Sequence, residues 1–350
     1  MKKVAIIGTQ GVPAQYGGFE SLVENIIGDN CSEGIEYTVF CSSLDKDSSL
    51  KEYKGCHLRY VPLHANGMQS VPYDMLSMMK AIRGYDTIVI LGTSGCLFLP
   101  ILRAFSRSRI IVNIDGLEHR REKWGKVART TLRLSERTAI RNADVVIADN
   151  KGIADYVEET YHKKAVIIAY GGDNAIRNVT ELRQQEILAQ YGLTADDYAI
   201  TVCRIEPENN THITLEAFKR TGRPLIFIGN WEHSAYARDL KKTYAHLDNI
   251  QLVNSIYDLD VLYALRKNAH CYVHGHSAGG TNPSLVEAMS IGCRIVAFDV
   301  VYNRETTHGK ALYYHDVESL IQLLDTDWGD YSELRVIAKQ QYNWATIAKA

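Results

Sequence analysis

Short apolar runs alternate with helix-patterned segments along almost the whole chain, and this alternation limits the folds that the chain can adopt. A repeated strand-helix-strand order places the strands parallel in a sheet, with helices on its faces. In the first half we expect strands at Val4–Ile7, Tyr37–Cys41, Leu58–Val61, Thr87–Leu91, Ile110–Ile114, Val145–Ala148 and Val166–Ala169. In the second half we expect strands at Ala199–Val202, Leu225–Ile228, Ile250–Val253, Cys271–Val273 and Arg294–Phe298. The pattern predicts an α/β protein with two doubly wound parallel sheets.

A polar, charged stretch after Gly171-Gly172 separates the two series of strands. The 350 residues are enough for two hydrophobic cores, since single domains usually number about 100 to 200 residues. Two glycines also provide a flexible joint between domains. We therefore expect Rossmann-like domains at residues 1–172 and 173–335, followed by a carboxy-terminal helix over residues 336–350.

The cysteines and the apolar runs indicate the cellular compartment in which the protein is found. Seven cysteines are scattered without a Cys-x-x-Cys pair, which argues against a disulfide framework and a zinc site and fits a reducing cytoplasm. No apolar run approaches the ~20 residues of a membrane span. The amino terminus enters a strand directly, without an apolar region of signal length. We expect a cytoplasmic protein.

Basic residues are concentrated in one segment, although the formal net charge of the chain is only −2. Between His119 and Arg141 there are eight basic residues and two acidic ones, and four arginines recur every four residues along one side of an expected helix. A solvated helix face is one interpretation. The density of charge equally favours binding of the stretch Arg120–Arg141 to a membrane surface or to lipid phosphates.

The segment from His276 to Asp299 predicts a polar glycine turn, a capped helix and a buried strand. Asn282 is a good N-cap and Pro283 suits the first helical position. We therefore expect the backbone amides from Gly280 to Leu285 to be unpaired and to bind an anion. Glu287 lies one turn further along the same face, where its carboxylate can accept hydrogen bonds from the hydroxyls of a phosphate-anchored ligand. A sugar nucleotide fits this pairing.

A capped core helix without a ligand would not explain Gly279-Gly280-Thr281. With these residues the segment resembles the signature of retaining glycosyltransferase family 4, whose members usually carry two glutamates eight positions apart. The position eight before Glu287 is Gly279, which implies a donor sugar with different hydroxyls. His276–Ser284 and the amino-terminal Gly8–Glu20 resemble the bacterial rhamnosyltransferase branch, and the resemblance runs over nearly the whole chain.

The resemblance implies the GT-B fold, in which two Rossmann-like domains face one another across a cleft. Ligands of open parallel sheets bind at the carboxyl ends of the strands, and the motifs identified in this chain follow strands. Residues 1–172 would then bind the acceptor and residues 173–335 the nucleotide sugar. The helix over residues 336–350 would cross back onto the first domain.

The loop after the first strand contains Gly17 and Gly18, which the resemblance brings near the donor phosphates or the reacting sugar. A dinucleotide-binding turn is an alternative, but it needs an acidic residue at the end of the second strand, and Val39–Ser43 has none. A purely structural tight turn is a further alternative.

Two charged residues follow strands and match functional positions of the family. The resemblance implies that Arg204 binds the donor diphosphate, and the planar donor fork of arginine suits that task. Five residues later, where the family usually has a lysine, this chain has Asn209. Backbone amides and a protonated histidine would therefore help Arg204 to neutralise the diphosphate. Asp115 stands where many members have a histidine, and its carboxylate would contact the sugar or the acceptor hydroxyl. A salt bridge for Arg204 and a capping role for Asp115 are the structural alternatives.

His274 and His276 form a His-x-His beside the glycine turn. No third metal ligand is conveniently spaced, so we expect His276 near the phosphates and no metal. The segment Asn254–Tyr257 follows a strand where the resembling enzymes hold the nucleobase, so Tyr257 is expected to flank the base. Ordinary packing at a strand end is equally consistent with it.

Together with these observations, the resemblance implies a retaining glycosyltransferase that moves L-rhamnose from dTDP-rhamnose to a lipid-linked sugar acceptor in bacterial surface polysaccharide assembly, on the inner membrane surface. We expect no cofactor, no metal and no nucleic-acid partner. The expected catalytic residues are Asp115, Arg204 and Glu287. The expected donor-binding residues are Gly17, Gly18, Arg204, Tyr257, His276, Gly280, Thr281, Asn282, Ser284 and Glu287. Alternatives are a UDP- or GDP-linked donor, a GT-B-type sugar-nucleotide epimerase, and a binding protein with a decayed site.

Overall fold

The computed structural model describes the chain except for residues 15–16, 29–33, 115, 118, 120–124 and 327–328. It divides into two compact units. Unit 1 comprises Met1–Ala169 and Trp344–Ala350, and unit 2 comprises Tyr170–Asn343. No helix among the described residues is long and apolar enough to span a bilayer.

Unit 1 contains an eight-stranded sheet within its described residues, in the order β3-β4-β2-β1-β5-β6-β7-β8. Its strands are β1 (Lys2–Ile7), β2 (Ile35–Ser42), β3 (Glu52–Tyr53), β4 (Cys56–Val61), β5 (Thr87–Leu91), β6 (Arg109–Ile114), β7 (Val145–Ala148) and β8 (Val166–Ile167). Its helices are α1 (Gly18–Ile26), α2 (Ser70–Lys80), α3 (Leu99–Phe105), α4 (Lys126–Asn142), α5 (Lys151–Tyr161) and α14 (Trp344–Ile347), with 3₁₀ turns η2 (Gly67–Gln69) and η3 (Cys96–Phe98). Every strand pair is parallel except β3 with β4.

Unit 2 contains a six-stranded sheet, again within the part of the chain that is described, in the order β11-β10-β9-β12-β13-β14. Its strands are β9 (Ala199–Val202), β10 (Leu225–Ile228), β11 (Ile250–Val253), β12 (Cys271–His274), β13 (Ile295–Phe298) and β14 (Leu312–Tyr314). Its helices are α6 (Glu181–Gln190), α7 (Thr211–Thr221), α8 (Ala235–Tyr244), α9 (Leu259–Lys267), α10 (Pro283–Ile291), α11 (Val301–Thr306), α12 (Val317–Leu324) and α13 (Ser332–Gln341), with 3₁₀ turns η5 (Asp173–Ala175) and η6 (Pro207–Asn209). All its strand pairs are parallel.

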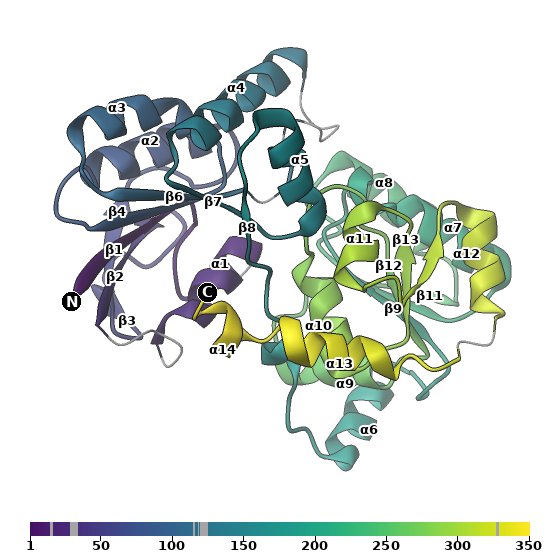
Figure 1. Cartoon of the computed structure of the whole chain (residues 1–350). Helices are drawn as coiled ribbons and strands as arrows, with labels where there is room; N and C mark the ends of the chain where they lie inside the picture. Colours follow the sequence, from purple (N-terminus) through teal and green to yellow (C-terminus); the bar gives the residue numbers. More distant parts are fainter. Residues whose placement is uncertain (15–16, 29–33, 115, 118, 120–124, 327–328) are drawn as a thin grey trace. The chain divides into compact units, whose positions relative to one another are not determined.

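Helices cover the unit 2 sheet in two layers (Figure 1). Helices α9, α10 and α13 form one layer through the contacts of α10 with the other two, and α7 with α8 and α12 forms the other. The core beneath α7 contains fully buried Phe218, Phe227 and Trp231, because β10 is apolar on both of its faces. Because helices cover both faces of this sheet, a ligand can reach it only at the ends of the strands.

The strand order reverses once in each sheet, and this switch point is where open α/β sheets bind ligands. In unit 2 the chain runs from β9 out through β10 to β11 and then returns to β12, on the other side of β9. The loops after β9 and β12 therefore diverge at the carboxyl edge. In unit 1 the same reversal separates β1 from β5.

The twelve strands expected from the apolar runs are all present, within about two residues at each end, and the two parallel α/β sheets are confirmed. Strands β3 and β14 were not expected. The single helix expected over residues 336–350 is wrong in detail, because α13 ends at Gln341 and α14 begins at Trp344. Between them Tyr342 leaves helical geometry, and its buried hydroxyl donates to the carbonyl of Thr306 at 2.9 Å.

One buried carboxyl group in unit 1 has a strongly shifted pKa. Asp74 of α2 is enclosed in the protein, and burial raises its pKa to about 8, although the backbone amide of Gly95 opposes the shift by hydrogen bonding. Because the folded-state pKa lies above the unfolded value of 3.8, this group stabilises the fold fully below pH 4. That stability is lost progressively as the pH rises from about 4 to about 8.

We expect Asp74→Asn to remove this pH dependence, since asparagine keeps the shape and an oxygen for Gly95 without a charge. In urea unfolding from pH 4 to 9, the free energy of unfolding of the parent should fall by up to about 1.4 kcal/mol per pH unit relative to the variant. Asp239→Asn on exposed α8 is the control and should follow the parent. A constant difference between Asp74→Asn and the parent across that range would contradict the assignment.

Candidate functional site

The glycine turn after β12 leads into a capped helix, as the residue pattern predicted. Asn282 has extended backbone geometry, and its side-chain oxygen accepts a hydrogen bond from the amide of Ser284 at 2.9 Å. Pro283 occupies the first helical position, and Gly292 in left-handed geometry ends the helix. The start of α10 thus lies at the carboxyl edge of the sheet, where the positive end of a helix dipole attracts anions.

The expectation of unpaired amides from Gly280 to Leu285 is partly wrong. The Ser284 amide is bound by the cap, and the Leu285 amide donates to the carbonyl of Asn282 at 3.0 Å. Asparagine at the N-cap satisfies these donors itself. Among the described residues, no acceptor contacts the amides of Gly279, Gly280 and Asn282. The amides that could bind an anion therefore lie earlier in the turn than we expected.

Gly279 has a backbone geometry that only glycine adopts readily. Its φ is +123°, and a Cβ atom on it would lie 3.1 Å from Nε2 of His276. A side chain at this position, eight before Glu287, would therefore strain the backbone and require the imidazole to shift. His276, itself buried, fills the space beside it.

Four hydrogen bonds join the loop after β9 to the loop after β12. Both the amide and the hydroxyl of Ser277 donate to the carbonyl of Glu208 at 2.8 Å. The side-chain amide of Asn210 donates to the carbonyl of Gly275 at 2.9 Å, and His276 bonds to Asn209 at 2.8 Å. These four bonds, which we call the loop tie, hold the two loops in one fixed arrangement.

Asn209 occupies the expected lysine position and orients His276. Its Nδ2 donates to the carbonyl of Arg204 at 2.8 Å, so its Oδ1 accepts from Nδ1 of His276. The hydrogen is thereby on Nδ1, and Nε2 is on the side of Gly279. Arg204 itself is partly exposed and lies 3.9 Å from Glu206, a distance too long for a direct hydrogen bond. The structure thus brings Arg204 and His276 to two loops that contact each other.

Glu287 belongs to a hydrogen-bonded cluster that the sequence did not reveal. Its Oε2 lies 2.9 Å from Nη1 of Arg266, and Nη2 of Arg266 donates to the hydroxyl of Ser284 at 2.9 Å. That hydroxyl also bonds to Tyr272 at 2.7 Å and donates to the carbonyl of Val202 at 2.9 Å. Burial is the strongest single influence on the pKa of Arg266 and lowers it, but the charge and hydrogen bond of Glu287, together with Tyr272 and Cys293, make the net direction upward. The hydroxyl of Ser284 is thus engaged within the protein.

The other predicted residues of unit 2 lie at the same edge. His274 is enclosed, and burial lowers its pKa to about 3, so it is neutral at physiological pH. Among the described residues, no third histidine, cysteine or acid completes a group that could hold a metal ion. Tyr257 is exposed just after β11, and Thr281 is buried within the turn.

In unit 1, Glu20 shapes the glycine loop after β1. Its Oε1 accepts from the hydroxyl of Thr9 at 2.9 Å and from the amide of Gln10 at 2.7 Å. A Cβ atom on Gly17, whose φ is +117°, would lie 1.9 Å from Oε2 of Glu20. Gly17 is therefore required there, and Gly18 begins α1.

Asp115 lies outside the described residues, as do positions 120–124 of the basic stretch. Sequence reasoning missed a buried carboxylate of unit 1. Buried Glu136 of α4 contacts Nδ1 of His119 at 3.1 Å and accepts from the hydroxyls of Tyr156 and Tyr161. Burial raises the pKa of Glu136, but these hydrogen bonds lower it below the ordinary value. The only sign of this carboxylate in the sequence was an acidic residue within a run of basic ones.

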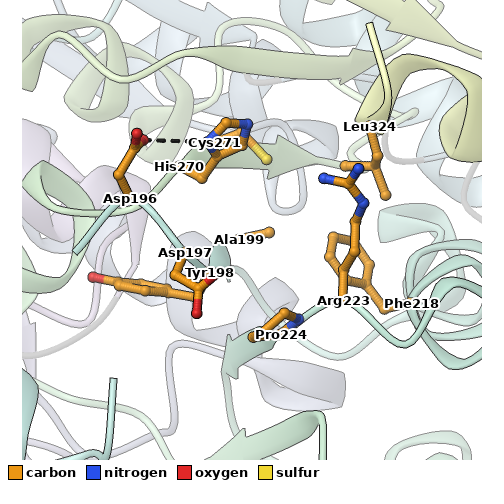
Figure 2. A pocket seen from close by; sticks show the side chains of 10 residues that line it. All are labelled: Asp196, Asp197, Tyr198, Ala199, Phe218, Arg223, Pro224, His270, Cys271 and Leu324. Atoms are coloured by element: carbon orange, nitrogen blue, oxygen red, sulfur yellow. Dashed lines mark hydrogen bonds and ion pairs between the residues drawn. The ribbon is translucent and has the colours of Figure 1, made fainter. Parts of the chain in front are cut away.

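A small, half-open pocket of unit 2 lies away from this edge (Figure 2). Its lining includes Ala199 and Cys271, the first residues of β9 and β12, so it opens at the amino ends of the strands. The lining also includes His270 and Asp196, which contact each other at 3.2 Å. Parallel sheets bind ligands at the opposite edge, and no predicted site residue lines this pocket.

Unit 2 is thus an open, doubly wound parallel α/β domain with a glycine turn at its switch point, the place where ligands of such sheets bind. Residues 183–313 match the family model described as Glycosyl transferases group 1. Residues 1–173 match a model described as Domain of unknown function (DUF1972). The first of these matches shows that residues 183–313, which belong to unit 2, are similar to group 1 glycosyl transferases. A search of curated proteins found no match.

Solved structures with the same fold cover the whole chain. Sucrose-phosphate synthase from Thermosynechococcus elongatus is 19% identical, with a TM-score of 0.81, and the match covers 100% of this chain and 97% of that one. Anabaena HepE in complex with UDP-glucose is 16% identical, with a TM-score of 0.78 and coverage of 100% and 98%. UDP-N-acetylglucosamine 2-epimerase from Rickettsia bellii is 14% identical, with a TM-score of 0.62 and coverage of 97% and 94%. These likenesses confirm the two parallel-sheet domains of the GT-B fold.

We expect Gly279→Ala to lower the free energy of unfolding by about 2–4 kcal/mol, because it combines backbone strain with overpacking against His276. Gly192→Ala is the matched control, since Gly192 also has positive φ (+64°) but no atom within 4 Å of its Cβ position. The control should cost about 1–2 kcal/mol. Urea unfolding of both variants measures the difference, and equal losses would show that His276 does not close this position.

Proposed function

We propose that this protein is a retaining glycosyltransferase that transfers L-rhamnose from dTDP-rhamnose to a lipid-linked sugar acceptor in bacterial cell-surface polysaccharide assembly. The observation that carries the proposal is the pair of tied loops at the switch point of unit 2. They bring one arginine, one buried histidine and a glycine turn to the edge where such sheets bind nucleotides. The neighbours in complex with UDP or UDP-glucose support a nucleotide-sugar donor.

In this proposal the donor diphosphate binds Arg204 and the amides of the turn from Gly279 to Asn282. A planar guanidinium engages two phosphate oxygens at once. His276 supplies the second positive charge that a lysine at position 209 would otherwise provide, by binding a proton on Nε2 when the diphosphate arrives. Asn209 keeps Nδ1 in place during that change.

The sugar and the base occupy the two sides of the diphosphate. Glu287 accepts hydrogen bonds from the ribose, and exposed Tyr257 flanks the nucleobase. Gly279 leaves no carboxylate for the hydroxyls of the transferred sugar, which favours a 6-deoxy sugar such as rhamnose over the usual hexoses. Gly17 and Gly18 of unit 1, and Asp115, would contact the donor sugar or the acceptor.

The reaction follows a front-face route. The acceptor oxygen forms its bond to the anomeric carbon on the side from which the diphosphate leaves, and the departing phosphate oxygen takes the acceptor proton. The bond between the anomeric carbon and the phosphate oxygen breaks with its electron pair on the phosphate. The protein contributes orientation and charge stabilisation, which are the main sources of rate when no covalent intermediate forms.

The acceptor reaches the enzyme at the cytoplasmic membrane surface through α4. Arg133, Arg137 and Arg141 are exposed, and among the described residues no carboxylate pairs with them. Neighbouring α3 exposes Ile101 and Phe105, the latter 70% exposed, one helical turn apart. Arginines beside exposed apolar side chains suit an anionic bilayer surface.

Arg204→Ala should weaken nucleoside diphosphate binding about 10- to 100-fold, because it removes charge-assisted hydrogen bonds of about 1.5–3 kcal/mol. Calorimetry with dTDP, UDP and GDP measures the effect and ranks the bases. Arg238→Ala on α8 is the control and should bind as the parent does. Unchanged affinity of Arg204→Ala would exclude the diphosphate role, and a preference for GDP would exclude the dTDP donor.

Reversing two charges of the stripe, in Arg133→Glu/Arg137→Glu, should lower binding to vesicles containing phosphatidylglycerol at least 10-fold, since each basic residue near such a surface contributes about 1 kcal/mol. Binding of the parent should also weaken with salt. Arg238→Glu/Lys242→Glu on α8 of unit 2 makes the same change in net charge and should bind as the parent does. Equal losses in both double variants would indicate a net-charge effect without a docking surface.

A further inference from the structure

Arg266 is the most buried charged side chain near the candidate site, and none of the roles above uses it. It lies in the last turn of α9, with 3% of its side chain exposed. A buried guanidinium needs partners for its charge and its donors. Its Nη1 and Nη2 atoms find partners on one face of α10, where Ser284 and Glu287 are three residues apart, whereas buried Nε has no hydrogen-bond partner among the described residues.

The cluster is anchored to the sheet at the switch point. The hydroxyl of Ser284 donates to the carbonyl of Val202, the last residue of β9, and the hydroxyl of Tyr272 from β12 lies 3.2 Å from the same carbonyl. The guanidinium of Arg266 is 6.0 Å from the centre of the Tyr272 ring. Arg266 is therefore held from the strands as well as from the helix.

Glu287 is held from one side only. Its Oε2 is bound by Arg266, whereas among the described residues Oε1 has no hydrogen-bond partner, and 21% of the side chain is exposed. A glutamate has three rotatable side-chain bonds, so an isolated one would sample many orientations of its carboxylate. The ion pair leaves one oxygen oriented and available for a ligand.

We propose that Arg266 is a positioning residue that fixes Glu287 to receive the ribose hydroxyl of the nucleotide. This inference rests on the proposed function, because it assigns Glu287 to the ribose. Arg266 does not touch the nucleotide. It holds the carboxylate in place before the ligand arrives, which reduces the entropy lost on binding.

The test compares two probes, dTDP and inorganic pyrophosphate, by calorimetry on the full chain. Pyrophosphate binds the turn and Arg204 but carries no ribose. Arg266→Met should weaken dTDP binding at least 10-fold and pyrophosphate binding less than 3-fold. Glu287→Gln should show the same pattern, and the double variant should be no weaker than either single variant, because the two residues act as one unit.

Two further variants separate positioning from support of the fold. Arg266→Lys keeps the charge with a less well-matched donor group and should recover part of the dTDP affinity lost in Arg266→Met. Lys267→Met changes the exposed basic residue next to Arg266 on α9 and should bind dTDP within 2-fold of the parent. Thermal melting identifies any variant that is unfolded. If Arg266→Met is unfolded, Arg266→Lys is compared with the parent in its place.

The outcomes distinguish the ribose contact of Glu287 from the positioning role of Arg266. If Glu287→Gln binds dTDP as well as the parent does, the ribose contact of the proposed function is wrong. If Glu287→Gln is impaired but Arg266→Met is not, the positioning role of Arg266 is wrong. If Arg266→Met loses dTDP and pyrophosphate equally, Arg266 supports the start of α10 as a whole, which also overturns the inference.

Discussion

The loop tie is the constraint on which the candidate site depends. Parallel strands β9 and β12 are neighbours, but the loops that follow them run in different directions and lead to different helices. The four hydrogen bonds of the tie join them, each with a net value of about 0.5–1.5 kcal/mol. Gly275 permits this approach, since a Cβ atom on it would lie 2.1 Å from the carbonyl oxygen of Asn209. Arg204 and the glycine turn are thereby presented together without a ligand.

The fold follows from the sequence because its strongest signals are local. Twelve apolar runs, each bounded by polar residues, predicted twelve strands, and the strand-helix alternation predicted parallel pairing. The missed strands β3 and β14 have two and three residues and join the edges of sheets, where few apolar side chains are needed. The break between α13 and α14 was also missed, because it depends on the distant contact of Tyr342 with Thr306.

The site could be predicted only in part, because several of its contacts join residues that are far apart in the sequence. Asn282 and Pro283 are adjacent, so the cap could be read from the residue pattern. The sequence indicated that Asn209 replaces a charge, but its hydrogen bond to His276 spans 67 residues and appears only in the fold. Arg266 stands in a Leu-Arg-Lys run at the end of a helix, which is typical of a solvated surface. Tertiary packing alone makes it a buried partner of Glu287.

The central claim is that the tied loops form a preorganised diphosphate site. A crystal structure of the protein with a bound nucleoside diphosphate tests it most directly. The account predicts phosphate oxygens within about 3 Å of the amides between Gly279 and Asn282 and of the Arg204 guanidinium, with the loop tie unchanged. A nucleotide bound elsewhere, or a turn that must unfold to admit it, would contradict the account.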